Sequence, residues 1–292
     1  MISTEYFQQA YNKWIEAFEK GEGINLRKIV CIDGKTMRGN SQKDRKPNHI
    51  VTAWCKDGGY SLGQKIVDEK SNEITAIPQL LDVLNIKGSI ITIDAMGTQT
   101  AITEKIREKR CHYVLAVKEN QKSLYEDISL YLNDEKHIEK IIKNGNYLKT
   151  IDKNHGMVEV REYYQTTSIS WLNGKEKWKG IKSIGMVVRK FNGVTEKRYY
   201  ISSLPCNIDE FSKAVRGHWS VESMHWHLDV TFREDADHTL DKTAAANMNI
   251  IRKWCLSMLE HVPFYKPNLS IRKKMFIISL DPAKHLDYVM SL

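Results

Sequence analysis

The sequence lacks the features that would place it in a membrane or in a secreted, disulfide-stabilised class. No uncharged apolar run approaches the roughly 18 residues of a membrane-spanning helix, and the start, Met1 to Glu5, shows no charged segment followed by an apolar one. The five cysteines are far apart and none forms a Cys-x-x-Cys pair, so neither a disulfide framework nor a cysteine zinc site is expected. We therefore predict a cytoplasmic protein without membrane contact, whose cysteines are reduced core residues.

What the sequence does contain is an ordinary globular composition with an uneven charge. Its 292 residues, 41% of them hydrophobic, suffice for one large domain with an insertion or for two domains. The net charge of +8 is compatible with nucleic acid but also with many other basic proteins. Residues 136–200 hold 14 Lys and Arg against 6 Asp and Glu, so the rest of the chain is neutral. A localised basic surface is therefore expected in that segment.

Two short apolar runs each end in an aspartate. Ser89 to Ile93 leads into Asp94, and Lys28 to Ile32 leads into Asp33. Apolar, β-branched runs of this length are typical of buried strands. One strand-terminal aspartate alone is more often a turn or helix-cap residue. Two strands of one sheet could however present both acids at the same end, and such paired carboxylates suggest a metal site.

A third acid, Glu222, lies in a predicted helix. A glutamate within a helix is usually a solvated helix former. At 3.6 residues per turn, however, His218, His225 and Asp229 fall on the same helix face as Glu222. An acid flanked by groups that can bind phosphate or hold water is more typical of a site than of a featureless surface.

Two other chemistries have less support. His218, His225 and His227 could bind zinc, but a helix places His227 on another face and no fourth ligand is visible. Ser220 lacks the Gly-x-Ser-x-Gly turn that would expose a hydrolase nucleophile.

The sequence blocks around these acids resemble one family. Ile-Asp-Gly-Lys from Ile32, Thr-Ile-Asp-Ala-Met-Gly-Thr-Gln from Thr92 and His-Trp-Ser-Val-Glu from His218 follow the order of the DDE transposases of the ISAs1 insertion-sequence family, which includes the H-repeat-associated proteins. Further blocks at residues 69–74, 113–121 and 155–161 extend the resemblance over nearly the whole chain. The wider IS4-like superfamily has Tyr, Arg, Glu and Lys at fixed spacings along the last helix. This chain keeps only the glutamate, with Val215, His218 and Asp229 at the other positions.

The resemblance implies a transposase that hydrolyses DNA at element ends and joins the freed 3′-hydroxyl to target DNA. Asp33, Asp94 and Glu222 would be the catalytic ligands of two Mg²⁺ or Mn²⁺ ions, with His218, His225 and Asp229 around them. The partner would be double-stranded DNA, bound by a homodimer. The residues expected to contact DNA are Lys35, Arg38, Lys70, Asn72, Lys118, Asn120, Gln121, His155, Arg161, Lys175, Lys177 and Lys179.

The expected fold is an RNase H-like α/β catalytic core, a mixed sheet flanked by helices, with a β-rich insertion before the last catalytic helix. We expect residues 1–24 to be a remnant of an N-terminal helical region, 25–144 the first part of the core, 145–201 the insertion, and 202–292 the last part with C-terminal helices. In the insertion, Trp171 and Trp178 could stack on extruded bases but are more typical of a core. Because family members usually carry a longer N-terminal helical region, the alternative is a catalytically inactive, shortened DNA-binding remnant.

Overall fold

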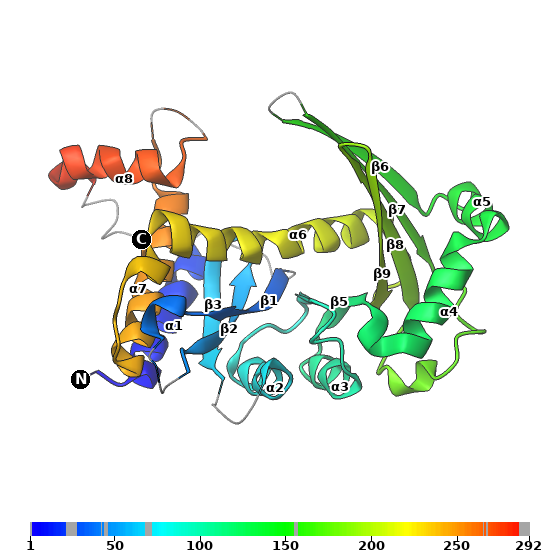
Figure 1. Cartoon of the computed structure of the whole chain (residues 1–292), viewed down its shortest axis with the longest axis horizontal. Helices are drawn as coiled ribbons and strands as arrows, with labels where there is room; N and C mark the ends of the chain where they lie inside the picture. Colours follow the sequence, from blue (N-terminus) through cyan, green and yellow to red (C-terminus); the bar gives the residue numbers. More distant parts are fainter. Residues whose placement is uncertain are drawn as a thin grey trace. The chain divides into compact units, whose positions relative to one another are not determined.

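The computed structural model describes residues 2–21, 28–41, 43, 46–67, 72–154, 157–264, 266 and 268–285. Within these residues, nine strands form one mixed sheet in the order β3-β2-β1-β4-β5-β9-β8-β7-β6 (Figure 1). The strands are β1 (Ile29–Thr36), β2 (His49–Cys55), β3 (Tyr60–Ile66), β4 (Ile90–Ile93), β5 (His112–Val117), β6 (Tyr147–Asn154), β7 (Met157–Thr166), β8 (Ser183–Phe191) and β9 (Val194–Ser202). The helices are α1 (Thr4–Gly21), α2 (Glu73–Val83), α3 (Thr100–Glu108), α4 (Lys122–Asn133), α5 (Glu135–Lys143), α6 (Ile208–Trp226), α7 (Lys242–His261) and α8 (Ile271–Leu280).

The first five strands have the predicted RNase H-like arrangement. β4 pairs in parallel with both β1 and β5, whereas β2 and β3 form an antiparallel pair. Parallel neighbours need a crossover connection, and α3 supplies it between β4 and β5. The predicted mixed α/β sheet flanked by helices is confirmed.

The chain forms two compact units. Unit 1 comprises Met1–Asn25, Asp33–Leu80 and Ser220–Leu292, and unit 2 comprises Leu26–Ile32 and Leu81–Trp219. The divisions fall within β1 and α6, so both of these elements contribute residues to both units.

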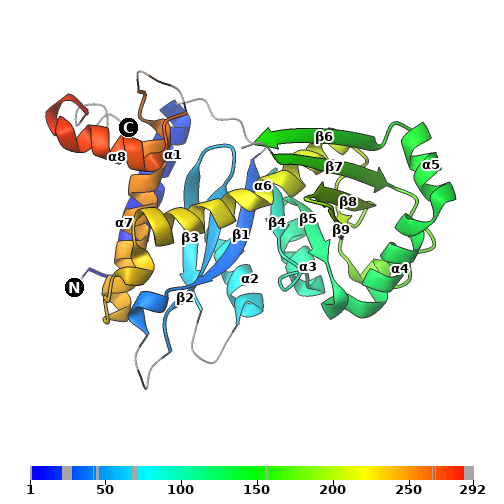
Figure 2. The ribbon, with the colours of Figure 1, turned by 45° about the horizontal axis from the view of Figure 1, so that its top comes forward.

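In unit 2, the β-rich segment continues the sheet. β9 pairs antiparallel with β5, and β8, β7 and β6 follow as antiparallel neighbours (Figure 2). The turn between β8 and β9 is Asn192-Gly193, both with positive φ, as a two-residue hairpin turn that matches the strand twist requires. One hydrophobic cluster includes Ile90 of β4, Tyr163 of β7 and Phe211 of α6. The segment predicted to be an insertion therefore shares a hydrophobic core with β4 and α6.

In unit 1, α1 packs on α7 and β3. One face of α1 buries Tyr11 and Phe18, and Trp14 lies 5.4 Å from Trp254 of α7 between ring centroids. The Tyr11 hydroxyl lies 3.3 Å from Ser257 Oγ of the same helix as Trp254. The aromatic stripe of the first helix is thus a packing face.

Two expectations about single residue types have different outcomes. Cys31, Cys55 and Cys111 are buried and form no disulfide, as predicted, but Cys206 is partly exposed and Cys255 is exposed, so the prediction of core residues was wrong for these two. Trp178 is buried, whereas Trp171 is partly exposed and stacks on Tyr131 at 4.4 Å between ring centroids. In the part of the chain that the structure describes, no helix combines the length and apolarity that crossing a bilayer demands.

Candidate active site

The carboxyl-terminal half of β1 faces two residues from the region of the predicted catalytic helix. Asp33 and Lys35 are two apart on the strand, so they point to the same side of it. His225 Nδ1 lies 3.3 Å from Asp33 Oδ2, and Lys35 Nζ lies 2.7 Å from Asp229 Oδ1. All four residues belong to unit 1. His225 and Asp229 are therefore both directed at β1.

Lys35 is enclosed by carboxylates. Its ammonium donates to Glu234 Oε2 at 2.8 Å and lies 3.6 Å from Asp235 Oδ1, and only 9% of its side chain is exposed. Burial acts to lower the pKa of Lys35, but the charges of Glu234 and Asp229 outweigh it and the pKa is raised. Lys35 is thus a charged residue whose donors are already used. This arrangement gives no support to the predicted DNA contact of Lys35.

After Trp226 the helix widens into a π-helix, His227–Thr231. Such segments are rare and occur frequently at functional sites. Asp229 lies within it, so the regular 3.6-residue spacing used to place Asp229 does not hold there. His227 Nδ1 lies 3.0 Å from Thr231 Oγ1, and burial lowers the pKa of His227.

The zinc alternative is not supported by these contacts. His218 Nδ1 lies 3.0 Å from Thr92 Oγ1, His225 is next to Asp33, and His227 is next to Thr231. Each of the three imidazoles is therefore bonded to a different partner.

In unit 2, Asp94 opens a tightly bonded loop after β4. Its Oδ1 accepts a hydrogen bond from Gly97 N at 3.1 Å, so the turn role considered for a lone aspartate is present. Asn120 Nδ2 donates to Ala95 O at 2.7 Å, and Gln121 Nε2 donates to Thr98 O at 2.9 Å. Asn120 and Gln121, predicted to contact DNA, therefore hold the loop that begins at Asp94.

The other predicted residues lie in varied surroundings. Glu222, Arg38 and Lys118 are exposed, and Asn72 Oδ1 accepts from Thr75 N at 3.3 Å at the start of α2. Lys175, Lys177 and Lys179 lie in the connection between β7 and β8, where Lys177 and Lys179 are exposed. Lys70 and His155 lie outside the described residues.

The predicted metal ligands fit Mg²⁺ by their chemistry, since hard carboxylate oxygens are what this ion takes. Among the residues that the structure describes, no three His, Cys, Asp or Glu side chains gather closely enough to hold a metal ion. In unit 1, Asp33 nevertheless keeps part of its carboxylate in contact with solvent, and Glu222 is exposed. The site assignment therefore stays a prediction.

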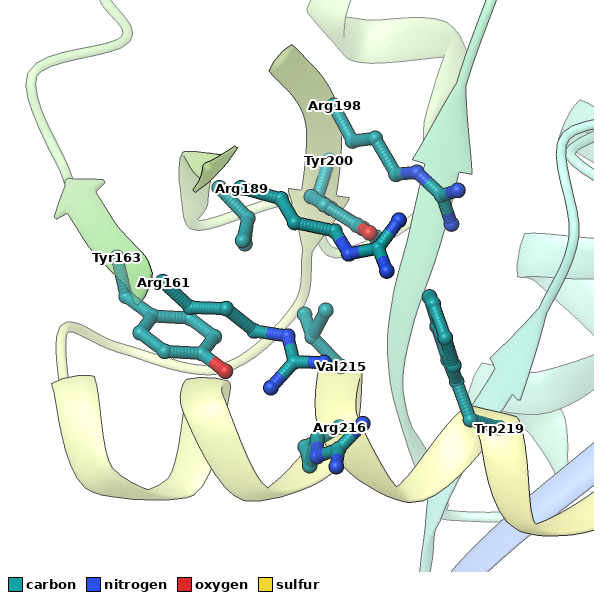
Figure 3. Close-up of a pocket in the computed structure, with 9 residues that line it drawn as sticks. Arg161, Tyr163, Arg189, Arg198, Tyr200, Val215, Arg216 and Trp219 are labelled. Carbon is teal, nitrogen blue, oxygen red and sulfur yellow. The ribbon is translucent and has the colours of Figure 1, made fainter. Parts of the chain in front are cut away.

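Four arginines that no local sequence pattern brings together surround Trp219 in unit 2. Figure 3 shows the guanidinium groups directed toward the indole and toward one another. Their carbon centres lie 5.4 to 5.8 Å from the ring centroid. The arginine cluster, as it is called below, consists of Arg161 of β7, Arg189 of β8, Arg198 of β9 and Arg216 of α6. Only the register of the strands reveals it, because β7 and β8 place Arg161 directly opposite Arg189.

Arg161, which we expected to contact DNA, is the most deeply buried member of this cluster. It donates to Asp152 Oδ2 at 2.6 Å and lies 2.5 Å from Glu159 Oε2, with 5% of its side chain exposed. These ion pairs fix Arg161 within the protein and leave it little surface for a direct contact with DNA.

Comparison with known proteins agrees with the sequence motifs. A family profile described as "Transposase DDE domain" matches residues 24–258. "Putative transposase YncI" of Escherichia coli O157:H7 is 35% identical over 287 residues, which cover 94% of this chain and 71% of that protein. "H repeat-associated putative transposase YhhI" of Escherichia coli (strain K12) is 33% identical over 297 residues, covering 96% and 75%.

Among solved structures, a piggyBac transposase in a synaptic complex with hairpin DNA aligns with a TM-score of 0.46 and 10% identity. The alignment covers 90% of this chain and 56% of that one, so the present chain spans little more than half of its length.

Proposed function

Because this chain belongs to the transposase DDE domain family, we propose that it cuts DNA at the ends of an insertion sequence and joins them to target DNA. The observation that carries the proposal is the register of two parallel strands. β1 pairs with β4 so that Ile32 lies opposite Ile93, and each of these residues is followed directly by an aspartate. We infer from this register that the two aspartates serve one reaction.

In this proposal Asp33, Asp94 and Glu222 hold two divalent ions, Mg²⁺ or Mn²⁺. When bound, the ions supply Lewis-acid stabilisation of the phosphate and activation of the attacking oxygen. The chain's own contribution is to orient the ligands. His225 lies against one carboxylate oxygen of Asp33, and Gly97 N fixes one oxygen of Asp94. Ligands held by such partners lose less freedom when they bind a metal.

The DNA would lie on the basic segment. Residues 136–200 carry a positive charge equal to that of the whole chain, which suits a phosphate backbone. We propose double-stranded DNA as the partner, bound by a homodimer.

The decisive experiment is a nicking assay with Mn²⁺ on duplexes that carry the native element ends, comparing the parent chain with Asp94→Asn. The asparagine keeps an oxygen that can accept from Gly97 N, so the loop is retained while the charge is lost. Loss of several kcal/mol of metal stabilisation predicts cleavage slower by at least about a hundredfold. DNA binding in metal-free buffer is expected to stay within about twofold, because the basic segment is unchanged.

The parent chain must cut for this comparison to succeed. If it binds correctly ended DNA but never cleaves it with Mn²⁺ or Mg²⁺, the proposal is wrong and the chain is a DNA-binding protein without catalysis. Equal cleavage by parent and variant would instead remove Asp94 from the active site.

A further inference from the structure

The arginine cluster carries more positive charge than its own acids neutralise. Its four guanidinium groups meet three carboxylates, which belong to Asp152, Glu159 and Glu196. One positive charge therefore remains, which is the charge that a single phosphodiester would balance. Gathering four like charges around one indole is unfavourable without such a partner, although contact with the ring face offsets part of the repulsion.

The members of the cluster are not equally held. Arg161 is fixed by two close carboxylates, and Arg189 pairs with Glu159. Arg216 differs, since its ion pair to Asp152 is 3.8 Å long and 48% of its side chain is exposed. Arg198 pairs with Glu196 at 2.9 Å and is 39% exposed. Buried Arg161 and partly exposed Arg189 thus form a fixed base, and Arg216 and Arg198 are more exposed to solvent.

A small pocket lies between these side chains and Trp219, lined also by Tyr163, Val187, Tyr200 and Val215 (Figure 3). Its free volume is about 20 Å³, close to that of one water molecule. This volume is too small for a nucleobase, but it accommodates one oxygen atom of a phosphate. Guanidinium groups present planar pairs of N–H donors that match such oxygens.

We infer that the arginine cluster is a binding site for one phosphodiester group of the DNA strand. One phosphate oxygen enters the pocket beside Trp219, and Arg216 and Arg198 donate to it from the solvent side. Arg161 and Arg189, with their carboxylates, hold the pocket open, and the surplus positive charge lies with the loosely paired Arg216. The assignment of the phosphate to DNA rests on the proposed function, whereas the affinity for a phosphate oxyanion does not.

The first test uses inorganic phosphate, without DNA or metal. Thermal unfolding of the full chain is measured in phosphate and in chloride of equal ionic strength. We expect phosphate to raise the melting temperature of the parent chain, and Arg216→Gln to lose most of that rise. Lys213→Gln is the matched control, because Lys213 is an exposed cation on α6 one turn before Arg216. The Lys213→Gln variant should keep the full increase in melting temperature that phosphate causes.

The second test measures DNA binding by fluorescence anisotropy at several salt concentrations. Removing the interaction with one phosphate should reduce the slope of log K against log salt by about 1 and weaken binding by about tenfold at low salt. We expect this for Arg216→Gln and Arg198→Gln but not for Lys213→Gln. Arg216→Lys keeps the charge without the planar fork, so its effect should be intermediate. Melting temperatures in chloride verify that each variant folds.

The outcomes separate this inference from the proposed function. If phosphate stabilises the parent through Arg216 but the chain binds no DNA, the oxyanion site stands and the transposase proposal fails. If DNA is bound and cut while Arg216→Gln changes neither the phosphate response nor the salt slope, the cluster is an ion-pair network only and the inference is wrong. An equal effect in Lys213→Gln would also overturn it, since the change would then report general surface charge.

Discussion

Lys253 of α7 lies inside unit 1 as a fully buried amine. Its Nζ donates to Thr52 Oγ1 at 2.7 Å and to Gln64 Oε1 at 2.6 Å. Burial lowers the pKa of Lys253 from 10.5 to about 7, although the nearby Glu234 carboxylate acts in the opposite direction. Two acceptors suit a neutral amine, so near pH 8 the folded chain holds Lys253 mostly uncharged.

This shift predicts a pH dependence of stability. Between about pH 7 and 10.5 the unfolded chain binds the Lys253 proton and the folded chain does not. The free energy of unfolding therefore rises with pH across that window, by up to about 1.4 kcal/mol per pH unit, and below it this contribution is constant. Urea unfolding of the parent chain and of Lys253→Met at pH 7, 8 and 9 tests this. As the pH rises, the free energy of unfolding of the parent should increase relative to that of the variant. If the free energies of unfolding of both chains change with pH in the same way, the expectation is wrong.

At the scale of elements, α1 depends on its packed face. Phe18 is buried and its ring centroid lies 4.6 Å from that of His261 on α7. Phe18→Ala should lower the free energy of unfolding by about 3 to 5 kcal/mol, because it leaves a cavity in the aromatic cluster. Glu16→Ala, on the exposed face of the same helix, should change it by less than about 0.5 kcal/mol. Denaturant unfolding measures both variants. If Phe18→Ala changes the free energy of unfolding no more than Glu16→Ala does, α1 contributes little to stability.

Elements with strong local patterns were predictable, and those without were not. The apolar, β-branched runs that precede Asp33 and Asp94 appear as β1 and β4, where the sequence placed them. Within the segment predicted to be β-rich, the bounds of β6 were not predictable, because Tyr147–Asn154 contains lysine, threonine and aspartate and few apolar residues. The sequence predicts C-terminal helices within 202–292 but no bounds for α8, where Phe276 is largely exposed and a buried apolar stripe is weak.

In the candidate site, too, local spacing predicted some residues, whereas other pairings arise only from tertiary packing. The spacing of His225 on the predicted helix placed it beside Glu222, and the structure directs it at Asp33. The pairing of Lys35 with Glu234 joins residues 199 apart, and no local pattern predicts such an interaction. Tertiary packing decides pairings of this kind, as it also brings Arg161 opposite Arg189.

At the scale of the whole molecule, the charge distribution predicts where salt dependence arises. Replacing Lys175, Lys177, Lys179 and Lys182 by Gln should flatten the dependence of log K for DNA on log salt by about 0.9 for each phosphate that the variant no longer neutralises. The charge-matched control replaces Lys13, Lys20, Lys273 and Lys284, which are exposed in unit 1. Its slope should stay near that of the parent. If only the control variant flattens the slope, the DNA-binding surface lies outside the basic segment.

The sequence separation between packed elements determines when each of them can fold during synthesis. The antiparallel strands β6 to β9 pair with their neighbours along the chain, so they can form soon after they leave the ribosome. The aromatic face of α1 can pack on α7 only after α7 has been synthesised, because Tyr11 and its partner Ser257 are 246 residues apart. At about 5 to 20 residues per second, that delay is about 12 to 50 s. Throughout this interval the nascent chain presents Tyr11, Trp14 and Phe18 without α7 to cover them, which gives chaperones at the ribosome exit a defined period in which to bind.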